Sequence, residues 1–468
     1  MNDVKTMDVK VKFGLKSFLT ICFILLAVMI CVGILTYIVP AGKYDSNLEF
    51  HFLESSSRLP FYRWFTAPIE SLFLGDFDIT FQIIQIILIL LILGGTFKIL
   101  DETGCLYSVV RIVVNKFYKH RYFLIWIVTL IMMLLASLFG LQEELLVLFP
   151  LFIMFAKAMG WSKVTAISLI LLTTGVGYTA AIFNPFSIGA ASELANTNVL
   201  DAVWYRLIIF AVLYFFTSLY LLYKVKREEK NGKYAVEGYN FEKLSEEELT
   251  QDKQKSKMVL SLFISVLAII ILSSSIPFLS DLGITMILMA SAFIIGTFII
   301  GSKQMGGFKN MIKPFWKGVI DIAPSIIVIL LAFSVKYIAD CGNILDTLFY
   351  YFYNMITSTS PYIAVTIMYV FVLLIEFFIP SSTAKVFLLI PLLTLVPIPH
   401  ISKNIILLVF LFGDGYTNVL YPTCGTLVIG LSLAEVNYGE WFKKTILFQI
   451  LLFIVSLSFI LFAVLIGL

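Results

Sequence analysis

Apolar segments long enough to cross a bilayer follow one another through most of this chain. Hydrophobic residues occupy 60% and charged residues 13% of its 468 positions, which leaves too few polar side chains to coat a water-soluble globule of that size. Within lipid a helix satisfies its own backbone hydrogen bonds, and about 20 residues span the hydrocarbon. The sequence therefore predicts an all-α polytopic membrane protein. Its small net charge of +3 gives no reason to expect a nucleic-acid partner.

A polar stretch divides the chain into two halves. The segment 224–257 contains nine Lys or Arg and eight Asp or Glu, a composition typical of a solvated connector. Lysines also precede the first apolar segment, so the positive-inside rule predicts that the N-terminus and this connector lie in the cytoplasm. In residues 1–223 we expect spans near 18–39, 80–100 and 203–223, a hairpin at 122–158 and a broken helix at 163–191. In residues 258–468 we expect spans near 258–278, 284–301, 319–337 and 445–466, a hairpin at 362–394 and a broken helix at 405–431.

Two similar segments lie at matching places in these halves: Gly175-Val176-Gly177-Tyr178-Thr179 and Gly413-Asp414-Gly415-Tyr416-Thr417. The same shift of 238 residues also places Lys98 on Lys336, which indicates an internal repeat. Counting the crossings gives the two halves opposite orientations, with the first hairpin either re-entrant or made of two full spans. Glycine-broken helices at corresponding positions of inverted-topology repeats are typical of transporter binding sites, because unwound backbone offers free polar groups.

Four motifs carry a family resemblance: residues 36–45, 140–150, 175–189 and 412–425. They resemble the signature segments of the YfcC-like branch of the anaerobic C4-dicarboxylate carrier (DcuC) family, within the ion transporter superfamily, and the similarity covers nearly the whole chain. The resemblance implies a secondary carrier of the bacterial inner membrane. It also implies a homodimer with two re-entrant hairpins and two broken helices around the substrate, working by an elevator mechanism. The implied substrates are either C4-dicarboxylates or, in this branch, basic amino acids such as arginine exchanged for ornithine.

Ionisable residues inside apolar segments bear on the charge of the cargo, since such groups are costly in lipid unless they serve a function. Glu143 and Glu144, at the tip of the first hairpin, either attract a cationic group or cap a helix. Asp414 either binds the cargo or a coupling cation, sodium or a proton, or caps a helix. Lys385 departs from the small residues usual in the family. It either contacts a substrate carboxylate, pairs with Glu376 or Asp414, or replaces a bound sodium ion.

Hydroxyl, amide and aromatic side chains around the breaks and tips complete the candidate site. An α-amino acid needs donors for its carboxylate and acids for its ammonium group, and both are present. The candidate substrate-binding residues are Glu143, Glu144, Gly177, Tyr178, Thr179, Asn184, Ser381, Ser382, Thr383, Lys385, Asp414, Tyr416, Thr417, Asn418 and Thr423. A dicarboxylate would need two cationic cradles, whereas Lys385 is the one evident central cation. We therefore expect a basic amino acid exchanger, with a carrier of C4-dicarboxylates or other small carboxylates, coupled to sodium or protons, as the alternative.

Two other functional classes share part of this pattern. An ion channel would also contain intramembrane acids and glycine breaks, but the paired hairpins favour a carrier. An enzyme is not expected, because His51, His120 and His400 lie in or beside polar connectors and the sequence contains no nucleotide or metal motif. The sequence accordingly predicts no cofactor. It predicts a small-molecule cargo and the lipid bilayer as the partners of the protein.

Overall fold

The computed structural model describes residues 15–45, 49–53, 59–74, 77–142, 144–231, 246–275, 282–356, 359–379, 382–394 and 401–468. Within them the chain is almost entirely helical, and the only strands are β1 (Gly42–Tyr44) and β2 (Phe50–Phe52), which pair antiparallel. The helices are α1 (Leu15–Ile38), α2 (Tyr62–Phe73), α3 (Phe77–Glu102), α4 (Cys105–Phe117), η2 (Tyr118–His120), α5 (Arg121–Phe139), η3 (Glu144–Leu148), α6 (Phe149–Ala158), α7 (Lys163–Thr179), η4 (Pro185–Gly189), α8 (Ala190–Leu194), α9 (Val203–Lys230), α10 (Glu246–Ser275), α11 (Leu282–Met305), α12 (Lys309–Ile322), α13 (Ser325–Cys341), α14 (Leu345–Ile356), α15 (Pro361–Glu376), α16 (Ser382–Thr394), α17 (Lys403–Thr417), α18 (Gly425–Leu433) and α19 (Tyr438–Ile466).

Eight helical segments of the described residues are long and apolar enough to cross a membrane. They are Phe18–Ile38, Ile83–Glu102, Arg121–Phe139, Val203–Lys230, Glu248–Ser273, Ile287–Met305, Lys309–Cys341 and Tyr438–Ile466. Large apolar side chains on these segments face outward: Phe23, Ile264 and Leu447 are 68%, 65% and 63% exposed. Apolar surface of this kind suits contact with lipid. The prediction of a helical, multi-span membrane protein is thereby confirmed.

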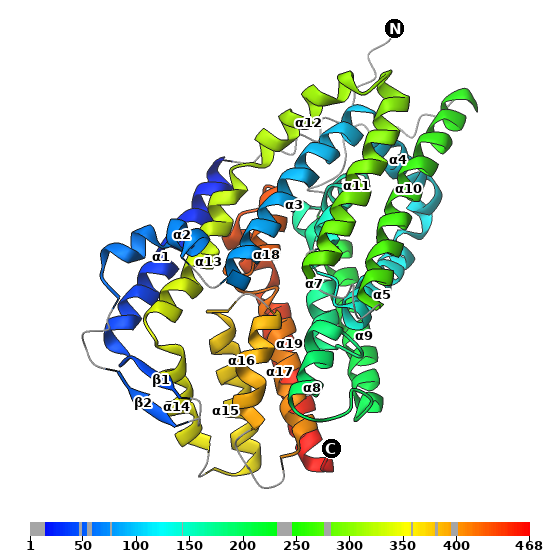
Figure 1. Ribbon diagram of the computed structural model, residues 1–468. Helices are drawn as coiled ribbons and strands as arrows, with labels where there is room; N and C mark the ends of the chain where they lie inside the picture. Colours follow the sequence, from blue (N-terminus) through cyan, green and yellow to red (C-terminus); the bar gives the residue numbers. More distant parts are fainter. Residues whose placement is uncertain are drawn as a thin grey trace.

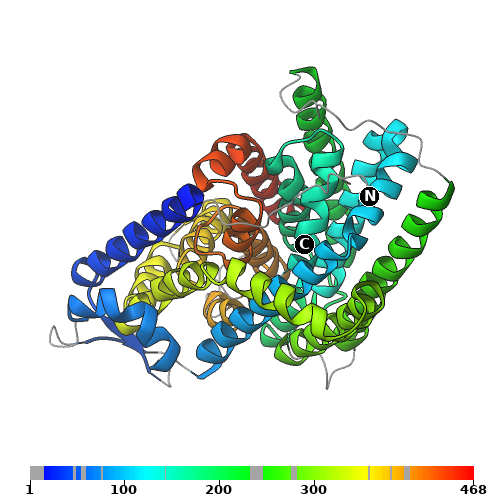
Figure 2. The same cartoon turned by 90° about the horizontal axis from the view of Figure 1, so that it is seen from above.

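Two groups of helices flank a central pair (Figures 1 and 2). On one side α1 and α2 pack against α13, next to the β-hairpin and α14; on the other side α10 packs against α4 and α11. Helix α12 runs along α3 and connects these sides. In the centre α7 contacts α17, while α5 and α9 pack on α7, and α15 and α19 pack on α17. The two halves of the chain therefore meet along α7 and α17.

The central helices α7 and α17 are buried on all sides. Every residue from Val164 to Thr179, and every residue from Ile405 to Thr417, is buried. This explains why both sequences read as apolar all round, without the single apolar stripe of a surface helix. With 17 and 15 residues, each helix is only about 23–26 Å long. Neither helix alone reaches across a hydrocarbon core of about 30 Å.

Helix extends further into the segment 224–257 than its polar composition suggests. Helix α9 continues to Lys230, and α10 begins at Glu246. Asp252 of α10 accepts a hydrogen bond of 2.8 Å from Ser108 and forms an ion pair with Arg111, both on α4. The charges in this part of α10 therefore attach it to the first half of the chain.

Candidate functional site

The two central helices are both interrupted, at corresponding places. Helix α7 ends at Thr179, and a short π-helical turn, η4, restarts at Pro185; α17 ends at Thr417, and α18 starts at Gly425. In each break a proline follows a non-helical residue, since Asn184 precedes Pro185 and Tyr421 precedes Pro422. The residue before a proline is driven out of the helical conformation. The prolines thus keep Asn184 and Tyr421 out of the helical conformation, within the break that follows each helix.

The first break is held by the end of α5. The Ser137 carbonyl accepts hydrogen bonds from the backbone amides of Ile182, Phe183 and Asn184 at 3.0, 3.1 and 3.0 Å. The Ser137 hydroxyl donates to the Ala180 carbonyl at 2.6 Å. Backbone groups that leave the helix are therefore paired within the protein, as buried irregular backbone in a membrane requires.

The glycines of the matching segments lie inside the helices and not in the breaks, contrary to the expectation that they unwind the backbone. Their role is close contact. A Cβ atom on Gly415 would lie 2.1 Å from the Thr179 backbone nitrogen, and one on Gly175 would lie 2.3 Å from Val419 Cγ1. A Cβ on Gly177 would lie 2.7 Å from the Met133 carbonyl oxygen of α5. Small residues of this kind allow helix backbones to approach closely in membranes.

The two interrupted segments run antiparallel along each other. At their crossing, position 175 faces 419 and position 179 faces 415. At one end Lys163, the first residue of α7, pairs with Glu435 at 2.5 Å, beyond α18. At the other end Lys403, the first residue of α17, donates to the Ala195 carbonyl at 2.6 Å, beyond α8. Figure 1 accordingly shows α8 and α18 at opposite ends of the pair.

Three charged side chains meet beside the second break. Lys385 Nζ lies 2.6 Å from Glu376 Oε2 and 2.7 Å from Asp414 Oδ1. Thr417 donates its hydroxyl hydrogen bond to Glu376 Oε2 at 2.8 Å. The side chains of Lys385, Glu376 and Asp414 are 1%, 0% and 1% exposed, so this charge is sealed inside the protein. We call Glu376, Lys385, Asp414 and Thr417 the central cluster.

A second group of polar side chains surrounds the turn after α5, which we call the first tip (residues 140–144). Asn418, in the second break, donates from its side-chain amide to Gln142 Oε1 at 2.9 Å. The backbone N–H of Gln142 donates to Glu144 Oε2 at 3.1 Å. Tyr178 donates its hydroxyl to the Gly140 carbonyl. Gly140 has a positive φ of 70°, and a Cβ there would lie 2.4 Å from Asn184 Oδ1. Thr417 and Asn418 thus connect the central cluster to the first tip.

The family model described as C4-dicarboxylate anaerobic carrier, DcuC, matches residues 17–465. This chain belongs to that family. The family resemblance is thereby confirmed, and this chain is a membrane transporter and not an enzyme, as expected. A relative in Escherichia coli (strain K12), provisionally named basic amino acid antiporter YfcC, is 23% identical over 494 aligned residues that cover 95% of this chain and 96% of the relative. An uncharacterized protein of Haemophilus influenzae is 21% identical over 378 residues, covering 78% of this chain and 72% of its own.

Two solved transporters align with most of this chain at low TM-scores. The Alcanivorax borkumensis YdaH transporter superposes with a TM-score of 0.41 at 14% identity, covering 96% of this chain and 98% of its own. Neisseria gonorrhoeae MtrF, described as illuminating a class of antimetabolite efflux pumps, gives a TM-score of 0.42 at 13% identity, covering 94% of both chains.

Some candidate binding residues of this DcuC carrier lie together and others do not. Lys385, Asp414, Thr417, Asn418 and Glu144 belong to the central cluster or to the hydrogen-bond chain that leads from it. The Thr179 hydroxyl bonds the Gly175 carbonyl of its own helix, and the Tyr416 ring faces Phe453 of α19 at 6.4 Å. Glu143 and Ser381, and the side chains of Ser382 and Thr383, lie outside the described part of the chain. Thr423 is buried in the second break.

Two residues of the site were absent from the candidate set. Glu376 is the partner of Lys385, and Gln142 is the partner of Asn418. The sequence does contain a signal for Glu376, because it is an isolated acid in the apolar run 361–379 and intramembrane acids are functional candidates. Of the alternatives for Lys385, pairing with both Glu376 and Asp414 is the one observed.

Proposed function

We propose that this transporter is a secondary carrier that exchanges basic amino acids, arginine for ornithine, by alternating access across the bacterial inner membrane. The observation that carries the proposal is the charge of the central cluster. Two buried carboxylates, Glu376 and Asp414, share one ammonium group, that of Lys385. Glu144, also buried, adds a carboxylate at the first tip.

A positively charged cargo fits the central cluster better than a dianion does. Uncompensated charge inside a membrane protein is costly, and a net-cationic amino acid offsets the excess of carboxylate. A C4-dicarboxylate would add two negative charges, and Lys385 already has both of its anionic partners. The same excess favours exchange over one-way transport, because the empty site would have to cross the membrane without its cation.

A donor for the carboxylate of an amino acid lies in the first break. Asn184 is fully buried, and its Nδ2 group has no hydrogen-bond acceptor among the described residues. Buried amide donors without a partner are rare, since leaving one unpaired costs about 1–3 kcal/mol. A substrate carboxylate at the first break would satisfy this donor.

The proposed mechanism rests on mirrored architecture. Antiparallel interrupted helices of matching length, each capped at its start by a serine, Ser162 or Ser402, support inverted-topology repeats of residues 1–223 and 258–468. The moving unit of an elevator would contain both hairpins and both interrupted helices. We propose further a homodimer, with the N-terminus and the 224–257 connector in the cytoplasm, and sodium or a proton as the coupling ion near Asp414.

Transport by purified protein in liposomes tests the proposal. Vesicles loaded with ornithine should take up labelled arginine in a saturable way that depends on internal ornithine, whereas succinate and fumarate should not be exchanged. Uptake of the dicarboxylates alone would establish the alternative substrate class. Flux that neither saturates nor responds to ornithine would indicate a channel.

Asp414→Asn should lower arginine exchange at least about tenfold, because a hydrogen bond to a charged group contributes about 1.5–3 kcal/mol. The matched control is Asp340→Asn, which changes an acid that pairs with Lys336 at 3.9 Å on α13. Both variants should elute as folded protein in size-exclusion chromatography. Undiminished exchange by Asp414→Asn would remove this residue from the site.

A further inference from the structure

The two carboxylate oxygens of Glu376 have unequal surroundings. Oε2 accepts hydrogen bonds from Lys385 Nζ at 2.6 Å and from the Thr417 hydroxyl at 2.8 Å. Oε1 is buried and has no hydrogen-bond donor among the described residues. An ionised carboxylate accepts about four hydrogen bonds, and an unsatisfied buried oxygen carries the full penalty of lost hydration. The described residues therefore saturate Oε2 and provide no donor to Oε1.

Glu376 Oε1 lies near Gly413 of α17, next to the Val372 side chain, whose Cγ1 would lie 2.3 Å from a Cβ on Gly413. A Cβ on Gly413 would lie 3.8 Å from Glu376 Oε1. Gly413 is one residue before Asp414, so Oε1 opens toward the same stretch of α17 that supplies the second carboxylate. The orphaned oxygen is thus part of the central cluster and not an isolated defect of packing.

The charge of the cluster follows from its contacts. With Glu376 and Asp414 ionised and Lys385 protonated, these three groups together carry a net charge of −1. Interactions between charges are strong where water is excluded. One added positive charge balances the cluster, whereas a neutral or dicationic cargo leaves it unbalanced.

Building on the proposed function, we infer that Glu376 Oε1 accepts the cationic group of the cargo, and that Lys385 sets the charge of cargo that the site prefers. Lys385 bridges the two acids permanently and cancels one of them. The remaining charge selects molecules with a net charge of +1, such as arginine and ornithine. Citrulline, the neutral counterpart of arginine, is discriminated against by its charge. Agmatine carries +2 and also lacks the carboxylate that Asn184 would bind.

Substitutions that alter this charge should shift the preference in a defined direction. Glu376→Gln brings the cluster to 0 and should lower the ratio of arginine to citrulline affinity at least about tenfold, the change expected when a charged hydrogen bond is lost. Lys385→Met brings the cluster to −2 and should shift preference from arginine toward agmatine. The double variant Glu376→Gln/Lys385→Met returns to −1, with Asp414 as its only acid. Its arginine preference should lie between those of wild type and Glu376→Gln.

Binding of labelled arginine, citrulline and agmatine to detergent-purified protein measures these ratios without requiring a full transport cycle. Lys336→Gln is the matched control, since it removes a buried lysine of α13 outside the cluster and should leave every ratio unchanged. Glu376→Asp retains the charge but withdraws the carboxylate by one methylene. It should keep the arginine-to-citrulline ratio and weaken the affinity for both.

The outcomes separate this inference from the proposed function. If the wild-type protein neither binds nor exchanges basic amino acids, the proposed function fails and this inference fails with it. If the wild type exchanges arginine but Glu376→Gln keeps the wild-type ratio of arginine to citrulline, only this inference is overturned. If Glu376→Gln does not fold, a Glu376→Asp variant that binds arginine and citrulline as tightly as the wild type does would overturn the role of Oε1. An unchanged preference in Lys385→Met would overturn the role of the lysine.

Discussion

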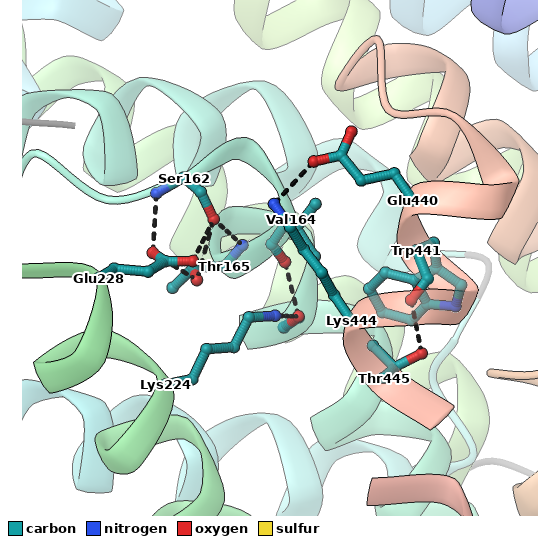
Figure 3. A network of polar contacts seen from close by, with 10 residues as sticks. Ser162, Val164, Thr165, Lys224, Glu228, Glu440, Trp441, Lys444 and Thr445 are labelled. Carbon is teal, nitrogen blue, oxygen red and sulfur yellow. Dashed lines mark hydrogen bonds and ion pairs between the residues drawn. The ribbon is translucent and has the colours of Figure 1, made fainter. Parts of the chain in front are cut away.

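The carboxylates beside the start of α7 differ from Glu376 of the central cluster in the number of hydrogen-bond donors around them. Glu228 accepts hydrogen bonds on both oxygens, from the Ser162 amide at 3.0 Å, the Ser162 hydroxyl at 2.6 Å and the Thr165 hydroxyl at 2.9 Å (Figure 3). In the same network Lys224 donates to the Ser168 hydroxyl at 2.8 Å. Both oxygens of Glu228 thus meet neutral donors from the chain itself. Glu376, in contrast, has one oxygen for which the described residues provide no donor.

Glu229, the neighbour of Glu228, is saturated in the same manner. Arg121 reaches both of its oxygens at 2.7 and 3.1 Å, Tyr122 donates at 2.5 Å and Trp161 donates at 3.1 Å. A carboxylate whose acceptor sites are all filled holds helices together, whereas an oxygen without a donor can accept a hydrogen bond from the cargo. The contrast therefore separates structural acids from candidate binding acids within one molecule.

Removing the shared cation of the central cluster should have the largest effect on stability. Lys385→Met leaves two buried carboxylates next to each other without the cation that they share, and breaking a buried ion pair from one side costs about 3–5 kcal/mol. We expect a clear fall in the thermal unfolding midpoint of the detergent-solubilised protein. The double variant Glu376→Gln/Lys385→Met should recover part of the lost unfolding midpoint. A midpoint equal to that of wild type would show that the acids do not depend on the lysine.

Removing a saturated acid should have a smaller effect on stability and none on selectivity. Glu229→Gln loses the ion pair with Arg121 and weakens the bonds from Tyr122 and Trp161, a loss of about 1–3 kcal/mol. Thermal unfolding and the arginine-to-citrulline binding ratio should be measured on the same preparation. A changed ratio would contradict the division between structural and binding acids.

The smallest change is expected at the cap of α7. Ser162 accepts from the Thr165 amide at 3.1 Å and donates to Glu228. Ser162→Ala should reduce the free energy of unfolding by about 1 kcal/mol, as is usual for loss of an N-cap. Ser261→Ala, on an exposed face of α10, is the control and should unfold as wild type does. Equal stability of both variants would assign the Glu228 network no structural role.

The helical, multi-span architecture and the family could be predicted from the sequence, because apolar length and local motifs determine them. The role of the glycines could not. Gly415 is glycine because Thr179, more than 200 residues earlier in the chain, lies against it, and no local signal distinguishes such a contact from a break. Proline, through its effect on the preceding residue, marks the interruptions more directly.

The site was predictable in its components but not in its pairing. Asp414 and Lys385 stand out as charges in apolar sequence, yet three roles for Lys385 were equally compatible with its position. Which one applies depends on the distance from α16 to α15 and α17, a property of packing. Glu376 was recognisable by the same argument as Asp414, since both are isolated acids within apolar runs.

The contact between Gly415 and the backbone of Thr179 has a consequence for the route of any solute. Where a single methyl group does not fit, nothing can thread between the two interrupted helices. A solute that reaches the central cluster must therefore come from beside this crossing and not from between the two helices.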